Sequence, residues 1–336
     1  MVNNSNNGIT LNREIKSEKE FSLKKFFFQW EWLLFLIFIA IHIINSQLSP
    51  YYLNTYTLLD ATMTFLDKAF IALSMTFVII FGDIDISVGS TIALASVIMA
   101  VLYNAGLPMP LAILVCLLVG VIAGFINGIL IVKFKELSAV IVTLSTMILY
   151  RGIAYIILEN QASGGFPMWF NFLGWGYIKT IIPFILVAFI IAAVIFYVLL
   201  HKTTFGRKVY AIGNNDVASL FSGVKVDKIK IIVFTLNGLM AAIAALFLTS
   251  KMGSTRPNIA SGYELDVIAM VVLGGVSTSG GKGRMIGVLL SIFIIGFLRY
   301  GLGLVNVPDQ VILIVIGILL IFSVMLSNLK LFSNKS

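Results

Sequence analysis

The sequence predicts an all-α fold, a polytopic transmembrane helical bundle with about ten spans and two Gly-rich helix interruptions. Composition is the first reason: 59% of the 336 residues are hydrophobic and 11% are charged, whereas soluble domains average about 45–50% and about 25%. The second reason is that the apolar residues form separate runs, and a bilayer core of about 30 Å needs roughly 20 of them per helix. The lipid bilayer is therefore the solvent of most of the chain.

Apolar run length divides the chain into candidate spans. The first run, 29–47, follows a polar tail and leads to no small-residue cleavage site, so we expect it to be retained as a membrane anchor. The third and eighth runs are short and interrupted by glycine, which leaves their boundaries open. The candidate spans are 29–47, 63–81, 88–104, 110–132, 137–158, 180–200, 231–250, 265–280, 285–300 and 308–327.

The positions of the basic residues predict the orientation of the chain in the membrane. An even number of spans puts both termini on one side, and most of the 23 Lys and Arg residues then fall on that side. Cytoplasmic connections carry an excess of Lys and Arg, so we expect both termini in the cytoplasm. The expected parts are a cytoplasmic polar tail (1–28), a transmembrane domain (29–327) with a long cytoplasmic loop (201–230), and a cytoplasmic C-terminal tail (328–336).

Charge and residue usage exclude several other classes of protein. The formal net charge is +8, but the basic residues are scattered between apolar runs and give no continuous basic face for nucleic acid. Cys116 is the single cysteine, so a disulfide framework and a Cys-based metal site are both excluded. His42 and His201 stand far apart and indicate no paired-His metal site. We therefore expect no nucleic-acid partner, no metal and no cofactor.

A short polar segment, 82–90, breaks the apolar sequence with Asp83, Asp85, Ser87 and Gly89. A carboxylate at the centre of a membrane helix costs about 2.5–3.5 kcal/mol on insertion scales. Irregular backbone at that depth is tolerated where it lines a polar path or the interior of a bundle, which makes these four residues candidates for such a path. A tight cytoplasmic turn at the end of a span is the alternative, because Asp and Gly cost little there.

A second glycine-rich segment, 274–281, repeats the spacing of the first. Gly82, Ile84, Ser87 and Gly89 correspond to Gly274, Val276, Ser279 and Gly281. We interpret the pair as a parallel internal repeat with an insertion in the second copy, which is typical of transporters that place discontinuous helices at the substrate path. Ser279 and Gly281 therefore join the candidates for that path. Four matches of common residue types are also compatible with coincidence.

The cytoplasmic loop is long enough to hold a short helix between 214 and 223. Its residues suit the cap, the first turn, an apolar edge and the end of a helix. They are Asn214 and Asn215 at the cap, Asp216 in the first turn, Ala218, Leu220 and Phe221 along the edge, and Gly223 at the end. A helix this short is marginal in water, so we expect it to dock against the bundle or a partner. A basic loop with a solvated turn of helix is the alternative.

Three ordered motifs carry a resemblance to a known family. They are Gly82 to Ser90, then Thr203 to Arg207 with Ala211 to Asn215 and Ser222-Gly223, and last Leu273 to Gly283 with Ile286-Gly287. Over about residues 30 to 327 they resemble the permease subunit of bacterial ATP-binding cassette importers, of the class that carries ribose and related monosaccharides. Gly164 to Met168 and Val307 to Gln310 look most like permeases for the furanosyl signal autoinducer-2, with rhamnose and ribose as alternatives.

The resemblance implies a permease without enzymatic activity in a bacterial inner membrane. Its implied partners are ATP-binding cassette subunits, a second permease of the same or a related kind, an extracytoplasmic sugar-binding protein and membrane lipid. The helix at 214–223 would couple the ATPase to the spans, with Arg207 and Lys208 beside it as donors to acidic groups on the ATPase. At Asp83 the family pattern has a second glycine, so either the local turn differs or the added acid has its own role. An intramembrane enzyme and a channel or scaffold subunit are the alternatives.

Overall fold

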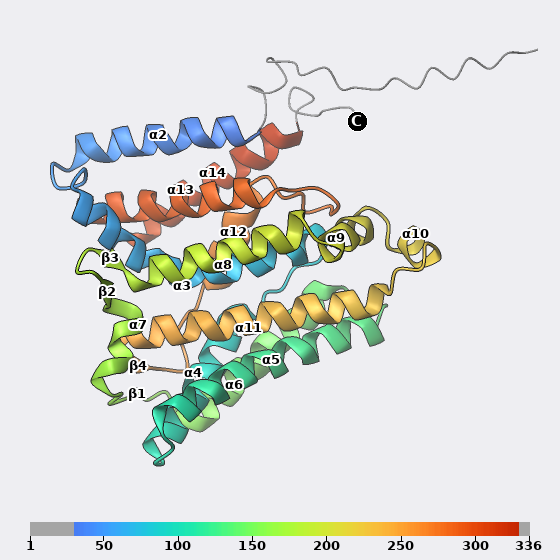
Figure 1. The fold of residues 1–336 in the computed structure, drawn as a ribbon, viewed down its shortest axis with the longest axis horizontal. Coiled ribbons are helices and arrows are strands. Elements are labelled where there is room, and N and C mark those ends of the chain that lie inside the picture. Colours follow the sequence, from blue (N-terminus) through green and yellow to red (C-terminus); the bar gives the residue numbers. More distant parts are fainter. Residues whose placement is uncertain (1–29, 329–336) are drawn as a thin grey trace, which may run out of the picture.

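The computed structural model of the chain describes residues 30–328. The predicted tail 1–28, nearly all of the tail 328–336, and the side chains at 322–324 and 326–328 lie outside the described residues. Helices run roughly along one direction, with α9 and α10 at one end and the short strands at the other (Figure 1). We call these the α10 end and the β end.

The elements follow in chain order, with two short antiparallel ladders, β1 with β4 and β2 with β3. They are α2 (Trp30–Leu48), α3 (Thr55–Ile80), α4 (Val88–Asn104), α5 (Met109–Lys133), α6 (Ala139–Leu158), β1 (Ser163–Gly164), the 3₁₀ helix η1 (Met168–Asn171), α7 (Phe172–Trp175), β2 (Tyr177–Ile178), β3 (Ile182–Pro183), α8 (Phe184–His201), α9 (Thr204–Asn214), α10 (Asp216–Phe221), α11 (Val226–Met252), β4 (Ser254–Thr255), α12 (Tyr263–Leu273), α13 (Met285–Leu304) and α14 (Asp309–Asn328).

Within residues 30–328, seven helices are long and apolar enough to cross a membrane: α2, α3, α5, α6, α8, α11 and α13. α4 and the Asp309–Ile321 part of α14 are apolar but shorter. The all-α polytopic bundle is thus confirmed, while the count of about ten spans stays a prediction. The expected span 265–280 is wrong at its end, because α12 stops at Leu273 and Gly275 turns the chain with φ +84°.

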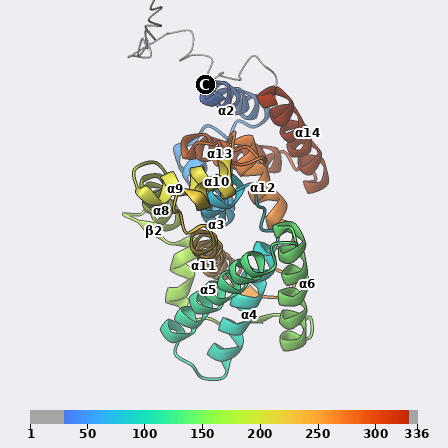
Figure 2. The ribbon, with the colours of Figure 1, turned by 90° about the vertical axis from the view of Figure 1, so that its right-hand side faces the viewer.

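α3 is the central helix of the bundle. It is buried almost continuously from Ala61 to Ile80, and it packs against α8, α11, α12 and α13. Figure 2 shows α2, α13 and α14 on one side of the bundle and α4, α5 and α6 on the other. α5, α6 and α8 carry rows of exposed Ile, Leu and Val side chains, which is the surface expected of helices in contact with lipid.

α5 and α11 meet along a seam of glycines. A Cβ on Gly120 would overlap the carbonyl oxygen of Gly238, and one on Gly124 would overlap that of Phe234. A Cβ on Gly128 would lie 2.8 Å from the Cα of Ile231. Small residues four apart let two membrane helices approach closely. α5 is therefore a tightly packed helix along this face, and the four-residue spacing of its glycines is the sequence signal of the contact.

The loop 201–230 contains the predicted short helix and a second one. α10 begins after Asn215, whose side chain accepts a hydrogen bond from the backbone N–H of Ala218 at 2.8 Å, and Gly223 follows its end with φ +80°. Asn214 is instead the last residue of α9. α9 was not expected from the sequence, and it is anchored on the bundle through three buried residues, Gly206, Val209 and Ile212.

Candidate functional site

The connection 81–87 leaves α3 through a glycine turn and then runs into the bundle. Phe81 caps α3, Gly82 has φ +84°, and the N–H groups of Gly82 and Asp83 donate to the carbonyls of Ile79 and Val78. This pattern of two backward hydrogen bonds around a left-handed residue closes a helix. The chain beyond Asp83 then has no helical partners for its backbone.

Asp85 organises the next turn. Asp85 is only 2% exposed. Its carboxylate accepts hydrogen bonds from the backbone N–H of Ser87 at 2.9 Å and from the Ser87 hydroxyl at 2.7 Å. The side-chain amide of Asn237 on α11 donates to its second oxygen at 2.9 Å. Buried carboxylates require such donors, because an unpaired one is costly. Asp85 thereby fixes the start of α4 against α11.

A buried hydrogen-bond network extends from Asp85 across four neighbouring helices. Asn127 on α5 donates to the Ser87 hydroxyl at 2.8 Å, and Tyr150 on α6 donates to Asn127 Oδ1 at 3.2 Å. Ser74 on α3 donates to Asn237 Oδ1 at 2.7 Å. We call this set the Asp85 network: Ser74, Asp85, Ser87, Asn127, Tyr150 and Asn237. The members other than Asp85 and Ser87 are polar residues inside apolar runs, and that is the one feature of the sequence that indicates them.

The backbone freed by the break finds its partners on α6. The N–H of Ile86 donates to the Thr143 hydroxyl at 3.2 Å, and that hydroxyl lies 3.2 Å from the carbonyl oxygen of Ile84, to which it donates. Main-chain groups at this depth must be satisfied within the protein. The surface-turn alternative is therefore wrong for Asp85 and Ser87, which lie in the bundle interior.

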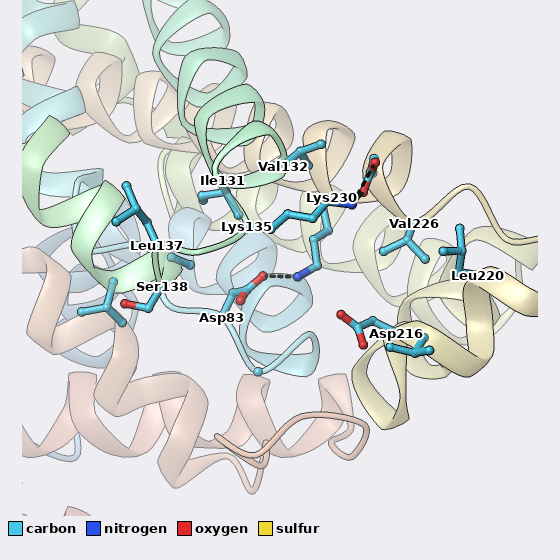
Figure 3. Close-up of a pocket in the computed structure, with 15 residues that line it drawn as sticks. Asp83, Ile131, Val132, Lys135, Leu137, Ser138, Asp216, Leu220, Val226 and Lys230 are labelled. Atoms are coloured by element: carbon cyan, nitrogen blue, oxygen red, sulfur yellow. Dashed lines mark hydrogen bonds and ion pairs between the residues drawn. The ribbon is translucent and has the colours of Figure 1, made fainter.

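Asp83 lies in a different place, on the wall of a cavity at the α10 end. Figure 3 shows it paired with Lys230 of α11, and the ion pair spans 3.0 Å. The cavity has a volume of about 430 Å³ and is also lined by Asp216 and Leu220 of α10 and by the α5–α6 connection. The added carboxylate thus has an ionic partner close to α10, outside the Asp85 network.

The second glycine-rich segment contacts the first, but its expected register is wrong by one residue. The N–H groups of Gly275 and Val276 donate back to Val272 and Val271, and φ of Gly275 is +84°. Gly275, rather than Gly274, is therefore the structural equivalent of Gly82. Gly281 lies in a loop with φ +72°, whereas its expected counterpart Gly89 lies in the first turn of α4.

Backbone contacts join both segments to the end of α9. The N–H of Gly281 donates to the carbonyl of Ile80 at 2.8 Å, and the backbone of Gly82 lies against that of Ser279, itself an exposed residue. A Cβ on Gly280 would lie 2.7 Å from the Gly213 carbonyl oxygen, and a Cβ on Gly213 would overlap the Ile80 carbonyl oxygen. We call this meeting of Ile80, Gly82, Gly213, Gly280 and Gly281 the glycine junction.

Gly89 is buried where α4 faces the start of α12. A side chain there would overlap the Glu264 carboxylate and would lie 2.7 Å from the Ala260 carbonyl oxygen. Arg151 on α6 holds the same stretch, since its guanidinium donates to the carbonyls of Pro257 and Ile259 at 2.7 Å each. Gly89 is therefore required for close approach at this point.

A second set of buried charges lies among α3, α11, α12 and α13. Asp67 pairs with Lys251 at 2.6 Å and accepts from the Tyr263 hydroxyl at 3.2 Å. Asp266 pairs with Lys68 at 2.6 Å and with Arg299. We call Asp67, Lys68, Lys251, Tyr263, Asp266 and Arg299 the ion-pair cluster. Our reading of the sequence missed it, although isolated charges inside apolar runs are a signal of such pairing.

The predicted coupling residues lie on the surface of the α10 end. Arg207, Asp216 and Ala218 are exposed, Leu220 is 59% exposed and Phe221 is 87% exposed. Ser219 is the buried residue of α10. Phe221 is therefore turned away from the described part of the chain, while Leu220 is exposed at the edge of the cavity that Asp83 lines.

Comparisons with known proteins agree with this architecture. The family model described as "Branched-chain amino acid transport system / permease component" matches residues 57–324. Ribose import permease protein RbsC of Bacillus subtilis (strain 168) is 41% identical over 298 residues, which cover 88% of this chain and 92% of that protein. Autoinducer 2 import system permease protein LsrD of Escherichia coli (strain K12) is 36% identical over 300 residues, which cover 87% and 90%.

No solved structure matches the chain. The family match covers well over half of the sequence and includes all three motifs, with α2 and the last residues of α14 outside it, which confirms the resemblance inferred from those motifs. The relatives are permease proteins, and none of the chemistry above requires an enzyme. The chain is a member of the family of branched-chain amino acid transport system permease components, a transmembrane permease subunit and not an enzyme.

Proposed function

We propose that the chain forms the translocation path of an ATP-binding cassette importer for a monosaccharide or a furanosyl compound such as autoinducer-2. The substrate class comes from the relatives, which are named as ribose and autoinducer 2 import permeases. ATP is hydrolysed on a separate subunit, and the chain pairs with a second permease, identical or related. An extracytoplasmic binding protein delivers the substrate at the β end, and both termini lie in the cytoplasm of a bacterial cell.

The observation that carries the proposal is the exposed apolar edge of α10. Phe221 is 87% exposed and Leu220 is 59% exposed on a helix of six residues. An isolated helix of that length is unstable in water, and its apolar side chains gain free energy when a partner covers them. An ATPase subunit is the partner that an importer needs at this end.

α10 is connected to the interior of the bundle by a short physical route. α10 follows α9 directly, and the last turn of α9 reaches the glycine junction through Gly213. The junction contains Gly82, three residues before Asp85. A rigid-body shift of α9 and α10 would therefore move the ends of α3 and of the 274–284 segment together.

Within this mechanism the site residues take different roles. Asp85, Ser87 and Gly89 shape the path through the bundle, because they fix the start of α4. Ser279 and Gly281 belong to the glycine junction and its surroundings. Asp83 joins the coupling region through Lys230. On α10 and beside it, Arg207, Asn215, Asp216, Ala218, Leu220, Phe221 and Gly223 form the ATPase contact.

Two variants separate docking from transmission. We expect Leu220→Asp with Phe221→Asp to weaken ATPase association and to abolish uptake in proteoliposomes that contain the ATPase and the binding protein. We expect Gly213→Val to abolish uptake while ATPase association persists, because its side chain would overlap Ile80 at the glycine junction. Gly152→Val on α6 is the matched control, since no atom lies within 4 Å of a Cβ there.

All uptake values are normalised to inserted protein. Normal uptake and normal ATPase association in the Leu220→Asp, Phe221→Asp variant would contradict the docking role of α10. Labelled ribose and autoinducer-2, each offered with the other as competitor, distinguish the two substrates.

A further inference from the structure

A groove at the α10 end carries three lysines whose charge no acidic side chain of residues 30–328 balances. It lies between α9 and the first turns of α11, has a volume of about 490 Å³, and is lined by Lys208, Lys225 and Lys228. Phe205, Ile229 and Ile232 form its apolar walls. We call it the lysine groove.

The three lysines have no ionic partner among the described residues, in contrast to the cations held inside the bundle. Lys68, Lys230, Lys251 and Arg299 each pair with a carboxylate. Asp227, next to Lys228 in sequence, pairs with Lys135 and lines the other cavity. The lysine groove therefore holds a local positive charge that an anion would neutralise.

The apolar walls restrict what kind of anion fits. Ile229 is buried at 7% exposure, while Ile232, one turn beyond Lys228 on α11, is 37% exposed. The groove thus passes from three ammonium groups to an exposed apolar side chain on a helix that can span a membrane. An anionic phospholipid likewise has a charged headgroup followed by hydrocarbon chains, whereas a free phosphate would contact the lysines alone.

The position of the groove favours lipid over the ATPase subunit. α8 ends and α11 begins beside it, and both are long and apolar enough to cross a membrane. Phe221 and Leu220, the apolar side chains that we assign to ATPase docking, do not line the groove, and Gly223, which does line it, brings no side chain to it. Clusters of Lys at the end of a membrane helix attract anionic headgroups, by about fivefold in affinity for each residue.

We propose that the lysine groove binds an anionic phospholipid, with its phosphate between Lys208, Lys225 and Lys228 and an acyl chain against Phe205 and Ile232. The site is independent of the transported substrate. It would hold α9 and the start of α11 together at the membrane surface, next to the helix that we assign to ATPase docking.

The test measures phosphatidylglycerol retained by the purified full chain, by native mass spectrometry from nanodiscs of phosphatidylglycerol and phosphatidylcholine. We expect the variant Lys208→Gln, Lys225→Gln, Lys228→Gln to bind phosphatidylglycerol about 100-fold more weakly. The control variant Lys133→Gln, Lys202→Gln, Lys282→Gln removes the same charge at the same end and should change binding less than about twofold. Replacing the three groove lysines by Arg should preserve binding.

Other outcomes overturn the proposal in distinguishable ways. Equal losses in the groove and control variants would indicate diffuse attraction without a site, and full retention in the groove variant would exclude the groove. Ile232→Ser should weaken lipid several-fold; an unchanged affinity, with displacement of the lipid by inorganic phosphate alone, would indicate a phosphate site. Loss of ATPase association by the groove variant in pure phosphatidylcholine would assign the lysines to the ATPase.

Discussion

The Asp85 network and the ion-pair cluster both bury carboxylates beside α3 and α11, but they balance the charge differently. Asp85 receives neutral donors, the Ser87 hydroxyl and N–H and the Asn237 amide. Asp67 and Asp266 receive cations, Lys251 and Lys68 among them. The first arrangement holds an irregular stretch of backbone in place, and the second ties regular helices to one another.

The two sets therefore differ in how much stability is lost when one member is removed. Removing one member of a buried ion pair leaves an uncompensated charge and costs about 3–5 kcal/mol. Removing one acceptor from a neutral network leaves unsatisfied donors and costs about 1–3 kcal/mol. The ion-pair cluster should therefore dominate stability, while the Asp85 network should dominate the shape of the path.

Asp266→Ala should have the largest effect on stability. It leaves Lys68 and Arg299 without their carboxylate, so we expect the free energy of unfolding in mixed micelles to fall by about 3–5 kcal/mol. The triple variant Lys68→Met, Asp266→Leu, Arg299→Met removes all three charges together and should recover most of that loss. If Asp266→Ala unfolds like the parent chain, the ion-pair cluster does not hold the helices together.

Asp85→Asn should have an intermediate effect on stability and a strong one on uptake. The new amide nitrogen replaces one of the two acceptor oxygens and so faces either the Ser87 donors or the Asn237 donor. We therefore expect a loss of about 1–3 kcal/mol with insertion preserved. Transport by the inserted protein should fall. Ser145→Ala is the control, because that exposed hydroxyl donates within its own helix, to Ile141. Normal uptake by Asp85→Ala would remove Asp85 from the path.

Lys135→Gln should have the smallest effect. Its ion pair with Asp227 spans 3.2 Å, and the two side chains are 69% and 54% exposed. Pairs of this kind contribute about 0.2–1 kcal/mol and are screened by salt. We expect a slight fall in the unfolding free energy at low ionic strength and none at high salt. A loss as large as that of Asp266→Ala would show that burial does not determine how much an ion pair contributes to the unfolding free energy.

Sequence reasoning located the polar break but not its partners. Two carboxylates among apolar residues signalled 82–90 because intramembrane charge is costly, and the cap at Asn215 and the turn at Gly223 follow from local chemistry. Asn237 is 152 positions from Asp85 in the chain, and nothing local encodes that pairing. The sequence alone therefore did not determine whether Asp85 is buried.

Other features of the fold were not predicted from the sequence either. α9 is short and basic, and its buried side is formed by Gly206, Val209 and Ile212, which recur at helical spacing and are a periodic signal that the prediction of a single short helix at 214–223 left unused. Gly82 was matched to Gly274 rather than to Gly275 because adjacent glycines cannot be told apart by composition. Backbone φ decides between them. The four-residue spacing of Gly120, Gly124 and Gly128 signals a close helix contact, but nothing within α5 identifies Gly238 of α11 as the partner.

The glycine seam makes α5 and α11 a rigid pair. α11 is 27 residues long, about 40 Å at 1.5 Å per residue, and its contacts with the glycines of α5 extend from Ile231 to Ala242. Contact over about three turns opposes a tilt of α11 about any single point. The Val226 end adjoins α10, and the Met252 end continues into β4, which pairs with β1. A displacement of α10 would thus reach the opposite end as a displacement of the α5–α11 pair as one body.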